Sequence, residues 1–155
     1  MSQWQTPGLG GLGCPPSACG CSPAPWPYQQ LTMSRGDTFV RDIQVTAPPP
    51  GAPPGAQPVP VDITGWTLWF TAKYNLADVD AQAVAQLSTL TSGIVLTTPT
   101  AGKAEITMPP GATVNFADAP VSIYYDVQAK DLSGRIFTVE RGVIVVTPDV
   151  TRTTG

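Results

Sequence analysis

The sequence contains no histidine, and charged residues make up only 12% of its 155 residues. Without histidine the chain lacks the commonest general base and metal ligand of proteins. Its acidic residues are scattered, and neither a nucleophile with a neighbouring base nor a glycine-rich phosphate loop takes their place. We therefore expect a protein that is not an enzyme and has no catalytic residues and no bound cofactor.

Positive charge and long apolar runs are also scarce. Eight Lys and Arg stand against eleven Asp and Glu, which gives a net charge of −3. No basic stripe marks a nucleic-acid binder, and no run of about 18 apolar residues predicts a membrane span. The opening MSQWQTPGLGG lacks the basic and apolar regions of a signal peptide. We expect a protein of the cytosol, or of a particle assembled there, without nucleic acid or membrane as a partner.

The first 34 residues carry no charge at all. Six of the 18 prolines and five of the 15 glycines lie in residues 1–27, which disfavours a helix or a continuous strand. Disordered solvated tails are usually rich in charge, whereas this segment carries Trp4, Trp26 and Tyr28. We interpret residues 1–29 as an extended docking arm whose aromatic side chains contact a partner. A flexible linker is the alternative.

The arm contains the three cysteines of the chain, Cys14, Cys19 and Cys21. Their spacing does not match the paired C-x-x-C of zinc modules, and one chain supplies no histidine to complete four ligands. Three states remain open. The thiols stay reduced, they form disulfides with the odd one left for a partner subunit, or symmetric copies pool them around a metal. Our expectation is no metal site within a single chain.

The last third of the chain predicts a long antiparallel hairpin. Apolar and polar residues alternate from Val121 to Lys130, which is the period of a half-buried strand. A turn is expected at residues 131–134, where Gly134 supplies a positive φ. A second strand follows from Arg135, and we expect Gly142 to form a bulge in it.

Upstream segments predict further short strands separated by turns. The Arg-Gly-Asp tripeptide at residues 35–37 is expected to be one such turn, residues 82–90 are ambiguous between helix and strand, and residues 112–116 suggest one helical turn. Seven to nine strands with frequent turns predict an all-β fold, an immunoglobulin-like antiparallel β-sandwich over residues 30–152. Besides the hairpin, its strands are expected at residues 31–34, 37–46, 66–74, 93–97 and 103–108.

A proline-rich loop is expected at residues 47–60, which hold seven prolines and no charge. It is predicted to be a polyproline-II-like excursion between strands. A loop of this length is usually functional or disordered. Packing against a neighbouring subunit and a stiff surface loop without a ligand are both open.

The strand after this loop, WTLWFTAKY, carries two tryptophans on opposite faces. Trp66 shares a face with Leu68, Phe70 and Ala72, which we expect to be the core. Trp69 lies on the other face, where a tryptophan is more often covered by a loop or a subunit than exposed. We therefore predict that Trp69 joins Trp4, Trp26 and Tyr28 as an interface residue.

Several of these segments together resemble a known family. They are RGDTF (35–39), VDITGWTLWFTAK (61–73), AGKAEITMP (101–109), VSIYYDVQAKDLSGRIFTVERGVIVV (121–146) and PDVTR (148–152). In this order they resemble bacteriophage virion proteins whose immunoglobulin-like module is similar to the N-terminal domain of phage baseplate upper proteins. The resemblance covers residues 31–152 and leaves out the arm and the proline-rich loop.

The resemblance implies a non-enzymatic structural protein of the virion, assembled in the host cytoplasm. Its partners would be other virion proteins and copies of itself, in the tail, baseplate or neck. Two alternatives stay open, a capsid decoration protein and a carbohydrate-binding module. The second requires exposed aromatic side chains gathered around Trp69 and Tyr124.

Overall fold

The computed structural model describes residues 29–150, and about half of these lie in β-strands. This part of the chain is mostly β, with one short α-helix and three sheets. The predicted arm residues Trp4, Trp26 and Tyr28 and the three cysteines lie outside the described residues. The elements are β1 (Gln29–Ser34), β2 (Phe39–Gln44), β3 (Thr46–Ala47), β4 (Val59–Pro60), β5 (Thr67–Lys73), η1 (Asp80–Gln82), β6 (Ala85–Ser88), β7 (Ile94–Thr98), η2 (Pro99–Ala101), β8 (Lys103–Met108), α1 (Pro110–Thr113), β9 (Val121–Lys130) and β10 (Ile136–Thr147).

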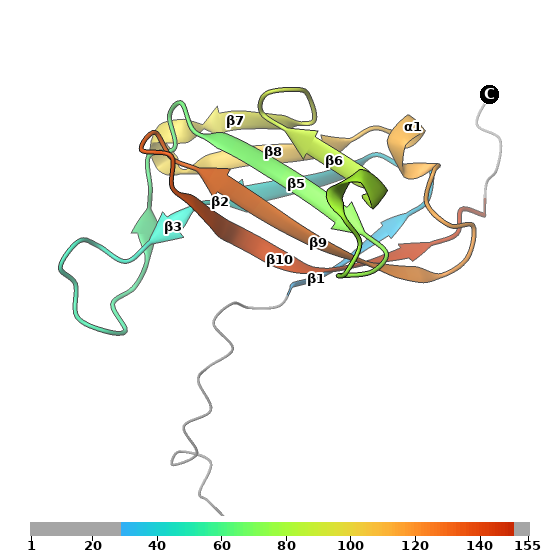
Figure 1. The fold of residues 1–155 in the computed structure, drawn as a ribbon, viewed down its shortest axis with the longest axis horizontal. Helices are drawn as coiled ribbons and strands as arrows, with labels where there is room; N and C mark the ends of the chain where they lie inside the picture. The colour runs from blue at the N-terminus through green and yellow to red at the C-terminus, as the bar shows by residue number, and fades with distance from the viewer. Residues whose placement is uncertain (1–28, 151–155) are drawn as a thin grey trace, which may run out of the picture.

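The largest sheet has five strands in the order β1-β10-β9-β5-β6. Its centre is the predicted terminal hairpin, in which β9 pairs with β10 on one side and with β5 on the other, both antiparallel. β1 runs parallel to β10 at the edge, with Gln29 opposite Gly142. The second sheet has three strands in the order β2-β8-β7, all antiparallel. In Figure 1 it lies behind the five-stranded sheet.

Residues of both large sheets contribute to one hydrophobic core. On β5 the side chains of Leu68, Phe70 and Ala72 are buried, as the alternation predicts. On β9 every second residue from Ile123 to Ala129 is buried in the same way. The Phe70 ring stacks on Tyr125 with centroids 5.7 Å apart. The buried side chains of the two sheets therefore share one core.

The turns fall where the sequence places them. Gly36 has a φ of +85°, and the Asp37 amide donates to the Ser34 carbonyl at 3.3 Å, so the Arg-Gly-Asp segment is a turn between β1 and β2. The ambiguous residues 82–90 divide into the end of η1 and the short edge strand β6. The expected helical turn is present as α1, two residues earlier than predicted.

Gly142 is not the bulge that the sequence suggests. The register of β9 and β10 shifts between Thr138 and Glu140, so the bulge lies at Val139. Gly142 is in regular register with Tyr125. A glycine is needed here for another reason, because a Cβ at this position would collide with the backbone oxygen of Gln29. β1 can lie against β10 here only because residue 142 is glycine.

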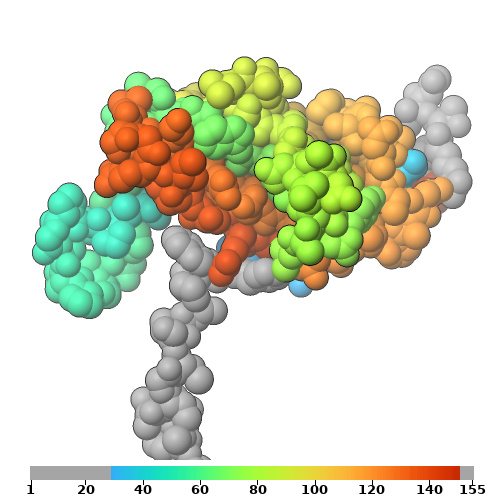
Figure 2. All heavy atoms as spheres, in the orientation of Figure 1, coloured from blue at the N-terminus to red at the C-terminus, as the bar shows by residue number. Residues whose placement is uncertain are grey.

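The proline-rich loop is a closed hairpin and differs from the extended excursion that we predicted. β3 and β4 pair at its base, with Thr46 opposite Pro60 and Ala47 opposite Val59. Two turns follow between them, in which Ala52 donates to Pro49 and Ala56 to Pro53. Figure 2 shows this hairpin, in turquoise, protruding from one end of the molecule near the β9–β10 turn.

Candidate interaction surfaces

Trp69 lies on the outer face of the five-stranded sheet, as predicted, where it is half-buried. It stands opposite Gln128 of β9 and Ser88 of β6. These residues line a shallow hollow of about 550 Å³, which Ile136 borders from β10. The indole therefore presents an apolar surface with amide and hydroxyl groups beside it.

A second hollow, of about 470 Å³, lies further along the same face and includes Tyr124, Asp126 and Arg141. Lys73 at its border is held in place, because its Nζ contacts Asp80 Oδ1 at 2.7 Å and donates to the Asp78 carbonyl at 2.8 Å. Burial raises the pKa of the Asp126 carboxyl, although a hydrogen bond from Gln128 partly offsets this. The hollow is polar and lined by charges of both signs.

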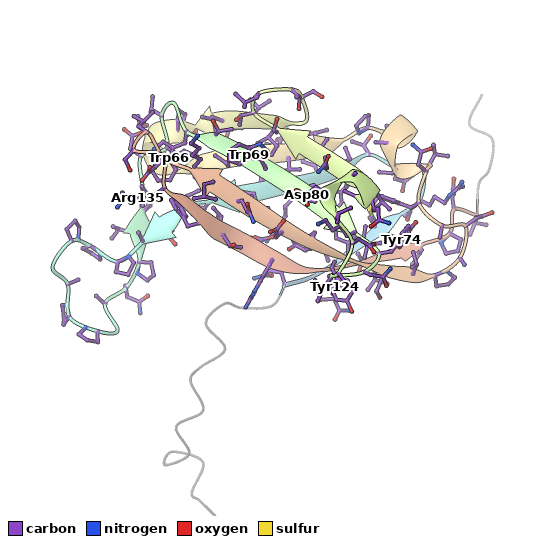
Figure 3. All side chains as sticks on the ribbon, in the orientation of Figure 1. Trp66, Trp69, Tyr74, Asp80, Tyr124 and Arg135 are labelled. Carbon is purple, nitrogen blue, oxygen red and sulfur yellow. The ribbon has the colours of Figure 1, made fainter. Side chains whose placement is uncertain are left out.

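Trp69 and Tyr124 do not share a hollow. Tyr124 stands opposite Lys73, four residues along β5 from Trp69. At about 3.3 Å per residue, this separates the two positions by roughly 13 Å. Figure 3 shows the Trp69 label towards one end of the sheet and that of Tyr124 towards the other. The aromatic cluster that a carbohydrate-binding module requires is therefore divided between two sites.

An ion pair joins the two sheets at the side where β2 approaches β10. Arg41 donates from Nη2 to Glu140 Oε2 at 2.8 Å and from Nε to Oε1 at 3.2 Å. Tyr125 Oη donates to the same Oε1 at 2.6 Å. Burial and this hydrogen bond raise the pKa of Tyr125 well above its usual value, and the Glu140 hydrogen bond raises the pKa of Arg41. The ion pair with Glu140 explains why Arg41, a charged residue, interrupts the apolar face of β2.

Asp131 organises the β9–β10 turn. Its Oδ1 accepts from the backbone amides of Ser133 and Arg135, both at 2.9 Å, and from the Ser133 hydroxyl at 2.7 Å. Its Oδ2 pairs with the Arg135 guanidinium at 2.7 Å. These hydrogen bonds, first that of the Ser133 hydroxyl, hold the pKa of Asp131 far below its usual range. The turn therefore presents Arg135 at the same end of the molecule as Trp66 (Figure 3).

A groove of about 1020 Å³ opens at this end, between the base of the proline hairpin, which follows β2, and the first residues of β10. We call it the seam groove, because its lining includes residues of both large sheets. Trp66 lines it and meets the Phe137 ring edge-on, with centroids 5.4 Å apart. Trp66 is therefore only partly buried, at the margin of the core that we expected it to enter. Its apolar walls are completed by Val45, Pro48, Pro58, Val61 and Val139.

Sequence reasoning placed Trp69 on the outer face correctly but missed the seam groove. The groove depends on β2, the proline hairpin and β10 meeting in space, and no local pattern reports such a meeting. One signal was present, because Ile136-Phe137 follows the turn as two adjacent apolar residues and breaks the alternation. Ile136 is 61% exposed and Phe137 37% exposed. Adjacent apolar residues of a strand point to opposite faces, so one of them has to lie outside the core.

Comparison with protein-family models and with curated proteins found no match to this chain. Among residues 29–150, no three potential metal ligands lie together. In the same part of the chain, no helix is long and apolar enough to cross a membrane.

Proposed function

We propose that this chain is a non-enzymatic structural protein of a bacteriophage virion, a multi-copy protein–protein interaction module of the tail, baseplate or neck. The observation that carries the proposal is the strand order. Strands β10, β9, β5 and β6 facing β2, β8 and β7 correspond to the G, F, C and C′ strands of an immunoglobulin-like sandwich facing B, E and D, and β1 is an additional edge strand parallel to β10. An immunoglobulin-like β-sandwich is the fold that the sequence resemblance implies.

The segments that resemble phage baseplate modules support the same proposal. Residues 35–39 form the turn into β2, residues 61–73 lead into and include β5, and residues 101–109 contain β8. The longest segment, residues 121–146, is the β9–β10 hairpin. The resembling segments therefore correspond to strands of the two large sheets, and the proline hairpin, which lies outside these segments, protrudes from the sheets.

The surface chemistry supports a binding role. The half-buried Trp69 on an outer sheet face and the apolar seam groove are features of contact surfaces, which are depleted in charge and enriched in aromatic residues. Binding in several copies would add the contributions of individually small patches. The neutral N-terminal segment, with Trp4 and the cysteines, is proposed to reach a neighbouring subunit.

Co-sedimentation of the purified chain with separated phage tails and capsids tests this proposal. The phage used is the one whose genome encodes the chain. We expect the protein to pellet with tails, and the variant Trp69→Ala to pellet less. Pelleting with capsids instead would identify a decoration protein. Pelleting with neither would contradict the proposal, and binding to a glycan array would then favour the carbohydrate-binding alternative.

A further inference from the structure

The proline hairpin, residues 46–60, has a preformed tip. Its central sequence is PPGAPPGA, residues 49–56, and each PPGA unit forms one turn. The Ala52 amide donates to the Pro49 carbonyl at 3.0 Å, and the Ala56 amide donates to the Pro53 carbonyl at 3.1 Å. The glycines of the two units have φ angles of +72° and +87° and follow a proline, which is the pattern of a type II turn. Because proline fixes the backbone, the tip has little conformational freedom to lose on binding.

The fold leaves this tip uncovered. Most residues from 48 to 60 are exposed, and no residue from Ile43 to Val61 carries a charge. Seven residues of the hairpin are prolines, and each has a carbonyl that accepts a hydrogen bond but no amide that donates one. A surface that receives the tip therefore has to be apolar and to supply hydrogen-bond donors.

The seam groove has both properties. Its apolar lining includes the edge-on rings of Trp66 and Phe137. Among residues 29–150, no hydrogen bond engages the Trp66 indole N–H, which is accessible to solvent. Arg135 also lines the groove; its side chain is 82% exposed and binds Asp131 with only part of its guanidinium, so further N–H groups are open. Aromatic-lined grooves of this kind are the surfaces on which proline-rich segments dock.

The hairpin and the groove lie side by side at one end of the molecule. Ala47, Pro48 and Pro58, at the base of the hairpin, form one wall of the groove, and the first residues of β10 form the other. The tip protrudes beyond this end, and Trp66 and Arg135 are labelled beside the hairpin in Figure 3. A contact across a two-fold axis needs both complementary surfaces on one patch of each chain. This end provides both.

The size of this end suits a pair of chains. It consists of residues 46–61, 64–66 and 131–139, which is within the roughly 20–30 residues that each partner of a standard interface contributes. The groove, at about 1020 Å³, has room for a turn of peptide chain. Val59 and Leu132, both exposed, lie at the same end and would be covered by the same contact.

We infer that two copies of the chain exchange their proline hairpins, so that the tip of each, residues 49–56, occupies the seam groove of the other. Proline rings pack against Trp66 and Phe137, and Trp66 and Arg135 donate to proline carbonyls. The contact is two-fold symmetric and forms in solution without any virion component. A chain that dimerises in this way but is absent from virions would contradict the proposed function alone.

Sedimentation equilibrium of the full-length protein tests this exchange, in reducing buffer so that the cysteines form no disulfide. We expect a reversible monomer–dimer equilibrium. Pro54→Asp at the tip and Ile136→Lys at the groove should each weaken dimerisation about tenfold or more, because each places a charge in an uncharged contact. A monomer at every concentration would overturn the inference, and so would an assembly larger than a dimer.

Val79→Lys is the matched control for Ile136→Lys. Val79 is 62% exposed and Ile136 is 61% exposed, but Val79 follows the far end of β5, roughly 20 Å along that strand from Trp66. It should leave dimerisation unchanged. Equal effects of the tip, groove and control variants would overturn the inference. Circular dichroism checks that each variant is folded.

Mixing the tip and groove variants tests whether the exchange is reciprocal. Pro54→Asp retains the native groove and Ile136→Lys retains the native tip, so a mixed pair has one native contact and one in which Asp faces Lys. We expect the mixture to form more dimer than either variant alone, measured by native mass spectrometry with one variant isotope-labelled. No gain on mixing would overturn the reciprocal exchange.

Nuclear Overhauser effects in the unmodified protein give a readout that no folding defect can affect. In a mixture of labelled and unlabelled chains, cross-peaks between the Trp66 indole and proline ring protons should arise between chains. Cross-peaks confined to one chain would overturn the inference, because the groove would then be filled or walled only by residues of its own chain.

Discussion

Arg41 on β2 and Glu140 on β10 form a two-point ion pair between the sheets, with the shorter contact at 2.8 Å. The bulge at Val139 makes this possible. In the shifted register Glu140 stands opposite the buried Val127, so its carboxylate is directed inwards. Without the extra residue, Glu140 would fall opposite Asp126 on the outer face. The bulge and the ion pair are therefore one device that fixes how the two sheets meet.

Removing one partner of this pair should destabilise the fold. Glu140→Gln leaves Arg41 without its counter-ion, and we expect a loss of about 1–3 kcal/mol in the free energy of unfolding, because both side chains are only partly exposed. Urea unfolding measures this loss. Glu105→Gln, on β8, is the matched control and should change stability by less than about 0.5 kcal/mol. Equal effects of both variants would show that the ion pair contributes little.

Lowering the pH should remove the stability that Asp131 contributes to the folded protein. Its folded pKa lies below the ordinary value of 3.8, so the stability that it provides is present above about pH 4 and is lost as pH falls further. The stability difference between the unmodified protein and Asp131→Asn should therefore be largest near neutral pH and shrink below pH 4. Unfolding curves at several pH values measure it. A difference that stays constant down to pH 2 would contradict this assignment.

Gly142→Ala should displace β1. The added Cβ would meet the Gln29 backbone, which cannot move aside as a flexible side chain can. We expect a cost of about 1–3 kcal/mol and faster amide exchange in β1. Gly111→Ala is the control, because nothing lies within 4 Å of a Cβ at that position. If both variants were equally stable, the close contact between β1 and β10 would be wrong.

The two tryptophans of the WTLWF segment should separate stability from binding. Trp66→Ala removes the edge-on contact with Phe137 and should cost about 2–3 kcal/mol in stability. Trp69→Ala removes part of the wall of an outer-face hollow, so we expect a stability loss of about 1 kcal/mol or less together with weaker binding to virion components. Thermal unfolding and co-sedimentation measure the two effects. Loss of binding in Trp66→Ala alone would move the contact surface to the seam groove.

The strands were the most predictable part of the fold. Alternation in residues 121–130 and 67–73 predicted β9 and β5, because each has one buried face and one outer face. The expected strand over residues 103–108 coincides with β8. Turn glycines such as Gly36 and Gly134 were equally informative, since both adopt a positive φ.

Features that depend on two distant segments could not be predicted. Gly142 looked like a bulge because a glycine within a strand usually marks one, and only the position of Gln29 shows the actual constraint. Arg41 looked like a break in an apolar face until Glu140 was placed opposite it. The seam groove likewise needs β2, the proline hairpin and β10 together. Of the predicted interface residues, the structure describes Trp69 alone.

The most direct test of the proposed function is quantitative mass spectrometry of gradient-purified virions from the phage that encodes the chain. The proposal predicts that peptides of this protein are present in several copies per particle and remain with the tail fraction when tails and capsids are separated. Their absence from purified virions, with the protein found only in the infected-cell lysate, would contradict it.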